Sequence, residues 1–337
     1  MKKIRKLHIL TAMLFFAAAI LVSCSKPSAP VRQDMADDRL NVVTTLFPYY
    51  DFTRQISDGK TDLTLVIPAG MDSHSFEPTP ADMRTIQNAD ILICNGGAME
   101  HWLTEVLDSI DTSGMTVVTM MDYIDAVEEE AVEGMEDGEQ EEHDHGAHKA
   151  YVDYDGHEEE IEYDEHIWTS PVNAMKLVGV IRDALQQADP ENAAAYQDSA
   201  ADYLEELSQI DAGFKEVSAA RIRSMIIVAD KFPFRYFAEE YGLDYRAAFS
   251  GCSTDTEPSA KTIAYLIDKI RNENIPVVYY LELSSSRVAE IISEETGAQP
   301  LLLHSCHNVT RAQFDSGITY VDLMRQNIEN LRKGIDE

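Results

Sequence analysis

The sequence predicts an α/β fold of two Rossmann-like lobes of parallel sheet, flanked by helices and joined by one long helix. Short apolar runs alternate with helical patterns before and after residues 190–220, and such alternation favours parallel sheets. Within 190–220 the large apolar residues recur at spacings of seven, four, three, four and three, which places them on one helical face. They are Tyr196, Tyr203, Leu207, Ile210, Phe214 and Val217.

Each lobe is predicted from four apolar runs and the helical patterns between them. The first lobe, 40–189, is expected to hold strands at 41–46, 62–67, 89–94 and 115–120, with helices at 49–57, 80–88 and 102–110 and from 171 onward. The second lobe, 221–337, is expected to hold strands at 224–229, 244–249, 276–281 and 300–303. Its helices are expected at 235–241, 260–272, 285–296 and 317–333.

The composition excludes several classes of protein. The chain has 337 residues, of which 45% are hydrophobic, so it can bury a sizeable core. Its 60 Asp and Glu residues against 27 Lys and Arg residues give a formal net charge of -33, which repels phosphate backbones and argues against nucleic-acid binding. Such a charge favours cations as partners. Four cysteines are too few for a disulfide-rich scaffold.

The first residues are predicted to be a signal for export and not part of the folded domain. Lys2, Lys3 and Arg5 precede an apolar run at 9–22, which has the length of a signal peptide and is short for a membrane span. The run ends in Leu-Val-Ser-Cys at Cys24, which resembles a bacterial lipobox. We expect a lipoprotein signal at 1–24, a flexible tether at 25–39 and a lipid on Cys24 that holds the protein outside the cell membrane. The alternative is a secretory signal with a coincidental cysteine.

The first lobe carries an acidic insertion at 122–165. It contains 20 Asp and Glu residues and one lysine, Lys149, so it cannot fold on its own. Four histidines lie within it: His143, His145, His148 and His157. Imidazoles among so many carboxylates predict a weak, exchangeable metal-collecting loop. The alternative is a solvated insertion without a function.

Four ligand-type side chains are expected at strand ends or beside the insertion. Ligands of α/β sheets bind where loops leave the carboxyl ends of strands. Three imidazoles and one carboxylate there would form a four-coordinate site that suits Zn²⁺, with Mn²⁺ as the alternative. The four candidates are His74, His166, His304 and Asp230. Any one of them alone is more often a loop histidine or a capping aspartate.

Several motifs carry a resemblance to a known family. His74 stands in G-x-x-x-H-x-F-E-P-T-P-x-D, and His166 stands in Asp-Glu-His-Ile-Trp followed by Ser-Pro. With the lipobox, these motifs resemble the zinc and manganese solute-binding lipoproteins of ABC transporters, which include zinc-uptake and adhesin-like members. The resemblance implies two α/β lobes bridged by a rigid helix. It also implies one metal in the interlobe cleft, held by four side chains, one pair from each lobe.

The resemblance makes His74 and His166 the pair from the first lobe and leaves the second pair open. Counting back from the aromatic pair at 236–237 places the third ligand on Lys231, whose ammonium has no lone pair for a metal. Asp230 is the predicted substitute, and His304 takes the fourth position. The alternatives are His307, Cys306 and Glu282.

The cysteines after second-lobe strands predict a disulfide. Cys252 and Cys306 both follow such strands and could meet at one sheet edge. A disulfide between them is possible in an exported protein, because the environment outside the cytoplasm is oxidising. A thiolate ligand from Cys306 is the alternative, and Cys94 is expected to be a buried, inert thiol.

The resulting prediction is capture of Zn²⁺ and its delivery to a membrane permease that works with a cytoplasmic ATPase, by a monomer that is not an enzyme. A nitrogen-rich ligand set favours zinc over manganese. A zinc hydrolase is disfavoured because the chain lacks H-E-x-x-H, and Ala147 breaks the only H-x-H-x-D-H-like run. A binding protein for another solute and a surface adhesin remain as alternatives.

Overall fold

The computed structural model describes residues 39–135, 151–152, 158–159, 162–253 and 257–336. The described residues from Arg39 onward pack as one compact unit. The predicted signal peptide with Cys24, and the loop histidines His143, His145, His148 and His157, lie outside the described residues. No helix in the described part is both long and apolar enough to cross a membrane.

The first sheet confirms the predicted parallel arrangement. Its strands are β1 (Leu40–Thr44), β2 (Thr61–Leu65), β3 (Ile91–Cys94) and β4 (Thr116–Thr119), in the order β2-β1-β3-β4 and all parallel. The helices of this lobe are α2 (Phe47–Ser57), α3 (Pro80–Gln87), α4 (His101–Ser109) and α5 (Pro171–Ala188). All four residues of β3 are buried, which explains why this strand appears in the sequence as a continuous apolar run.

The second sheet repeats this architecture. Its strands are β7 (Met225–Phe232), β8 (Asp244–Ser250), β9 (Val277–Tyr280) and β10 (Gln299–Leu302), parallel and in the order β10-β9-β7-β8. Its helices are α7 (Arg235–Tyr241), α8 (Ala260–Glu273), α9 (Arg287–Thr296), α10 (Arg311–Asp315) and α11 (Tyr320–Ile335). Only α10 was not predicted. It begins at a capping box of Thr310 and Gln313 and spans five residues, too few to show a helical period.

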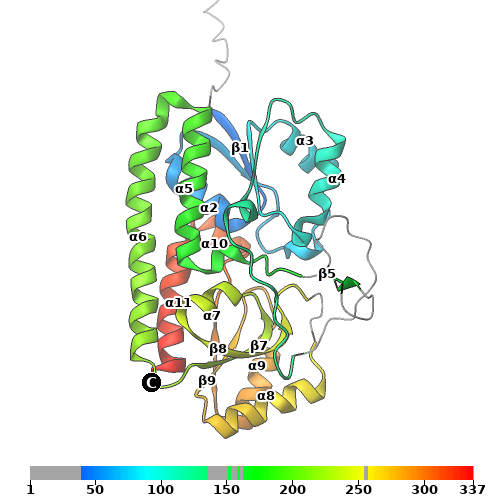
Figure 1. Cartoon of the computed structure of the whole chain (residues 1–337), viewed down its shortest axis with the longest axis vertical. Helices are drawn as coiled ribbons and strands as arrows, with labels where there is room; N and C mark the ends of the chain where they lie inside the picture. The colour runs from blue at the N-terminus through cyan, green and yellow to red at the C-terminus, as the bar shows by residue number, and fades with distance from the viewer. Residues whose placement is uncertain (1–38, 136–150, 153–157, 160–161, 254–256, 337) are drawn as a thin grey trace, which may run out of the picture. The chain divides into compact units, whose positions relative to one another are not determined.

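The long helix joins the two lobes as predicted. It is α6 (Ala193–Ala220), a helix of 28 residues that follows a 3₁₀ turn at Pro190–Asn192. The apolar face predicted from the spacing is buried along its whole length, from Tyr196 to Val217. Figure 1 shows α6 running beside both lobes, with α5 against it in the first lobe and α11 in the second.

The described flanks of the acidic insertion fold against the second lobe. Glu129 N donates to Glu162 O and Asp164 N donates to Val127 O, both at 2.9 Å, so the two flanks pair with each other. Tyr236 of α7 accepts a hydrogen bond from Val127 N at 3.2 Å and donates one to Asp164 O at 2.7 Å. The insertion has too few apolar residues for a core of its own, so the second lobe supplies its packing surface. Two short strands within it, β5 (Tyr151–Val152) and β6 (Glu158–Glu159), pair antiparallel.

Candidate metal centre

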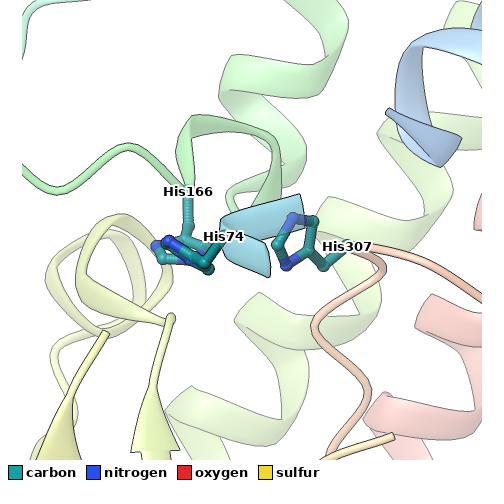
Figure 2. Close-up of side chains that lie close together, drawn as sticks. All are labelled: His74, His166 and His307. Carbon is teal, nitrogen blue, oxygen red and sulfur yellow. The ribbon is translucent and has the colours of Figure 1, made fainter. Parts of the chain in front are cut away.

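Three histidines meet between the two sheets: His74, His166 and His307. One possible ligand atom from each lies within 4.8 Å of the other two. The ring centroids stand 6.1 Å apart for His74 and His166, 5.8 Å for His74 and His307, and 5.7 Å for His166 and His307. Figure 2 shows the three rings converging from three separate segments. This cluster, called the histidine triad below, is the only group of this kind among the residues that the structure describes.

The two first-lobe histidines are held by the same kind of hydrogen bond, in which an aspartate accepts from the backbone N–H of the histidine. Asp72 caps the 3₁₀ turn Ser73–Ser75, and its Oδ1 accepts a hydrogen bond from His74 N at 2.8 Å. Asp164 Oδ1 accepts from His166 N at 2.7 Å and lies 3.2 Å from His166 Nδ1. Each is an aspartate two residues before its histidine, a spacing that favours such a turn. The contact at Nδ1 leaves Nε2 of His166 for a metal.

His307 enters the triad from the second lobe, where we expected His304. Both follow β10, but Cys306 between them has a φ of 61°, in the left-handed region. This turn separates the directions of the two side chains. His307 approaches the first lobe, where its Nε2 contacts the Ser73 hydroxyl. The geometry therefore brings His307, one of the alternatives, into this cluster, and it leaves His304 outside.

His304 faces the interior and braces the loop that carries His307. It is 1% exposed, its N–H donates to Asn327 Oδ1 at 2.8 Å, and its Nδ1 accepts from Cys306 N at 3.0 Å. Glu282, another alternative ligand, accepts a hydrogen bond from Ser305 N at 2.8 Å and lies 3.4 Å from His304 Nδ1. Both side chains are used to fix this loop, and neither joins the triad.

Asp230 also lies outside the triad. Its Oδ1 accepts from Lys231 N at 2.8 Å. Burial raises the pKa of this carboxyl, against hydrogen bonds from Lys231, Ser284 and Leu281 that lower it. The prediction of Asp230 as the third ligand is therefore not supported by the geometry, because the carboxylate is bound within its own loop.

The predicted disulfide is absent. Cys94, Cys252 and Cys306 are all free thiols. Cys252 lies next to Glu129, whose Oε1 accepts from Cys252 N at 3.0 Å, whereas Cys306 is buried in the turn after β10 beside His304. Burial raises the pKa of both thiols far above the ordinary value. Neither sulfur belongs to the triad, so the alternative of a Cys306 thiolate ligand is also unsupported.

Hydrogen bonds tie the three histidine loops together. Asn308 Nδ2 donates to Pro68 O at 2.9 Å and to Met71 O at 2.8 Å, which joins the His307 loop to the loop before His74. Trp168, two residues after His166, donates from Nε1 to Ser305 O at 2.9 Å. Its ring also lies against both His166 and His307, with centroids 5.5 and 5.4 Å away. The three histidines are thus positioned relative to one another before any metal arrives.

The three imidazoles differ in their affinity for protons. Burial lowers the pKa of His74 to about 4, helped by the nearby His166. Burial likewise lowers the pKa of His307 well below its ordinary value. Burial also opposes protonation of His166, but the charge and hydrogen bond of Asp164 outweigh it, and its pKa is raised. At neutral pH, His74 and His307 therefore offer lone pairs directly.

The donor set fits a zinc ion. Around a tetrahedral Zn²⁺ with Zn–N bonds of about 2.0–2.1 Å, neighbouring nitrogens stand roughly 3.3 Å apart. The triad, at up to 4.8 Å, needs only small side-chain rotations to reach that spacing. Three nitrogen donors leave the fourth position of the metal for another ligand.

A family model for a zinc-uptake complex component, the periplasmic component A (ZnuA), matches residues 42–334. The chain belongs to this family. Its members are metal-binding transport proteins and not enzymes, as the sequence predicted.

Two curated relatives carry related names. The high-affinity zinc uptake system protein ZnuA of Bacillus subtilis is 34% identical over 346 residues, a match that covers 99% of this chain and 98% of that protein. The zinc-binding lipoprotein AdcA of Streptococcus pneumoniae is 33% identical over 336 residues, covering 99% of this chain but 62% of AdcA. The chain therefore spans less than two thirds of AdcA.

Two solved structures share the fold. The metal-dependent lipoprotein YcdH of Bacillus subtilis superposes with a TM-score of 0.71 at 30% identity, covering 89% of this chain and 100% of that one. The Zn(II)-bound ZnuA-like domain of Streptococcus pneumoniae AdcA also gives a TM-score of 0.71, at 28% identity and with the same coverage of both chains, 89% and 100%. The predicted fold class and family are confirmed.

Proposed function

We propose that this chain is the extracytoplasmic solute-binding lipoprotein of a metal ABC transporter, which captures Zn²⁺ on His74, His166 and His307. The observation that carries this proposal is the histidine triad between the lobes. Its three nitrogen donors favour Zn²⁺ over Mn²⁺, because imidazole suits zinc and Mn²⁺ prefers oxygen ligands. The zinc-uptake and zinc-binding names of the relatives agree with this choice.

The second part of the proposed function is delivery of the bound Zn²⁺ to the transporter. A lipid on Cys24 would hold the protein at the outer face of the cell membrane, as a monomer. There it would pass the ion to a membrane permease driven by a cytoplasmic ATPase. The long helix α6 and the hydrogen bonds between the histidine loops favour small movements of the lobes over wide closure. The histidines of the acidic insertion, His143, His145, His148 and His157, would act as an accessory collector.

A metal titration tests the proposal. We expect the chelator-stripped protein without residues 1–24 to bind one equivalent of Zn²⁺ tightly and Mn²⁺ far more weakly. Deletion of 136–150 removes three of the loop histidines and spares the flanks that pair and bind Tyr236. This deletion is expected to leave the tight site intact and to remove only weaker equivalents. Isothermal titration calorimetry measures both.

Three outcomes of the metal titration would contradict the proposal. If tight binding disappears with the deletion, the loop is the zinc site and the triad is not. If Mn²⁺ binds as tightly as Zn²⁺, the site has an oxygen ligand set that the triad does not provide. If neither metal binds, the chain carries a different solute.

Protons released on zinc binding are expected to come first from His166, whose pKa is raised, rather than from His74 or His307, whose pKa values are lowered. A protonated imidazole has no lone pair for a metal, so a histidine whose pKa is raised competes with zinc at higher pH than one whose pKa is lowered. As the pH falls below the pKa of His166, the affinity should drop by about tenfold per unit. It should fall more steeply only as His74 protonates, near its pKa of about 4.

Calorimetry in buffers of different ionisation enthalpy counts the protons released. Replacing Asp164 with Asn removes the charge that raises the pKa of His166, so this variant should release fewer protons than the unaltered protein at the same pH. Release of two or three protons by the unaltered protein would show that the pKa values of His74 and His307 are not lowered.

A further inference from the structure

A lysine lies beside the histidine triad. Lys231 is near the end of β7, just after a shift in the register with β8 between Val228 and Lys231. Such irregularities redirect a side chain. Its Nζ lies 3.8 Å from Asp72 Oδ2, and its side chain is only 16% exposed. Asp72 caps the turn that carries His74, so the ammonium lies next to the triad. Its charge contributes to the lowered pKa values of both His74 and His307.

The carboxylates around the triad are already engaged in their own loops. Asp164 binds His166, and Asp230 binds Lys231 N. Among the described residues, none of the neighbouring carboxylates places an oxygen within the triad. The others and their partners are Glu165 with Met99 N and Ala98 N, Glu129 with Cys252 N, and Glu282 with Ser305 N.

This arrangement gives a bound metal no negatively charged ligand among the described residues, and the carboxylate that pairs with Lys231, that of Asp72, is half exposed. Zn²⁺ on three neutral imidazoles keeps its full charge of two, because imidazole brings none. The ammonium of Lys231 adds a third positive charge in a site that is largely closed to water. Buried charges of one sign are costly unless a counter-charge pairs with them. The fourth position on the metal is open at the same time.

We propose that this site takes up Zn²⁺ together with one small anion, which fills the fourth coordination position and pairs with the Lys231 ammonium. The anion is a halide or a small carboxylate, since it must offer a lone pair to the metal and accept a hydrogen bond from the lysine. One anion from solution would thus supply both the missing negative charge and the fourth ligand of the metal. The inference rests on the proposed function, because it concerns the same metal.

Zinc affinity with and without coordinating anions tests this inference. The measurement is competition against a chromophoric chelator at constant ionic strength, in perchlorate and then in chloride or acetate, with correction for the binding of the anion to free zinc. The unaltered protein should gain about tenfold or more in affinity from a coordinating anion. Lys231→Met should lose this gain, whereas Lys231→Glu should bind zinc tightly in perchlorate because it supplies its own carboxylate. Lys215→Met, on the exposed face of α6, is the matched control and should behave as the unaltered protein.

Co²⁺ in the same site provides a second readout. Its visible spectrum responds to a change in the fourth ligand, so exchange of chloride for acetate should shift the bands of the unaltered protein and not those of Lys231→Glu.

The outcomes separate the two proposals. If neither zinc nor cobalt binds in any medium, the proposed function itself fails. If zinc binds equally well in perchlorate, chloride and acetate, the function stands and the anion proposal is overturned. A full anion gain in Lys231→Met would show that the lysine is not the partner of the anion.

Discussion

Replacing His307 with Asn is expected to weaken zinc binding by at least about a hundredfold, since loss of groups that merely orient zinc ligands already costs roughly 10- to 100-fold. An amide is not among the usual zinc ligands, so the substitution removes one of three donors. The same substitution at His304 is expected to change zinc affinity by only a few fold. The amide oxygen of the new side chain could still accept the hydrogen bond that Cys306 N now donates to His304 Nδ1.

The pair of variants distinguishes the triad from the ligand set that the sequence predicted. Both positions lie on one loop, so a loss that came merely from disturbing the loop would be larger for the buried His304 than for His307. The measurement is zinc competition against a chelator, with denaturant unfolding of the metal-free variants to show that both are folded. His74→Ala serves as the reference for loss of a triad member. If His304→Asn loses more affinity than His307→Asn while its metal-free form is as stable as the unaltered protein, the metal lies on the inner side of the turn and the triad is not the site.

Much of the fold was predictable because the inner strands of both sheets are largely buried on two faces. Strands such as β3, with all four residues buried, appear in the sequence as short apolar runs. The long helix was predictable from the spacing of Tyr196 through Val217. The packing of the insertion flanks on Tyr236 was not predictable, because that contact joins residues 109 positions apart and depends on one hydroxyl.

The site was predictable only where a local motif fixes it. His74 and His166 each follow an aspartate by two residues, and the structure shows that aspartate holding the histidine N–H. His304 and His307 are three residues apart, and which one reaches the first lobe depends on the positive φ of Cys306. Cysteine seldom adopts this conformation, so nothing in the sequence signals the turn. The role proposed for Lys231 was not predictable either, because it depends on charged groups that come from separate segments of the chain.

Replacing Asp51 with Ala is expected to lower the free energy of unfolding by about 3–5 kcal/mol, because this buried carboxylate is the acceptor for an arginine, a tyrosine hydroxyl and a backbone N–H. The Asp51 side chain is fully buried and lies 2.6 Å from Arg54 Nη2. Its Oδ2 also accepts from Tyr203 Oη on α6 at 3.3 Å and from Tyr320 N, at the start of α11, at 2.6 Å. One carboxylate on α2 thus binds the linking helix and the last helix of the second lobe.

The alanine variant would leave these donors without their acceptor in a dry environment, where each unsatisfied group is costly. It would also remove a negative charge from the N-terminus of α11, where the helix dipole favours it. Asp51→Asn keeps the shape and one acceptor oxygen, so its loss should be smaller. Asp183→Ala is the matched control, because that aspartate also pairs with an arginine, Arg182, but is 66% exposed, and its loss should stay below about 1 kcal/mol.

Urea unfolding of the metal-free proteins measures all three variants. A loss of less than about 1 kcal/mol for Asp51→Ala would mean that water or another group replaces the carboxylate, and that the contact between α2, α6 and α11 does not hold the lobes together. The expected larger loss would have a consequence for the metal site. His74 and His307 come from opposite lobes, and their separation is fixed through this contact as well as through their own loops. Zinc added in excess should therefore restore part of the lost stability, because it binds only the folded arrangement.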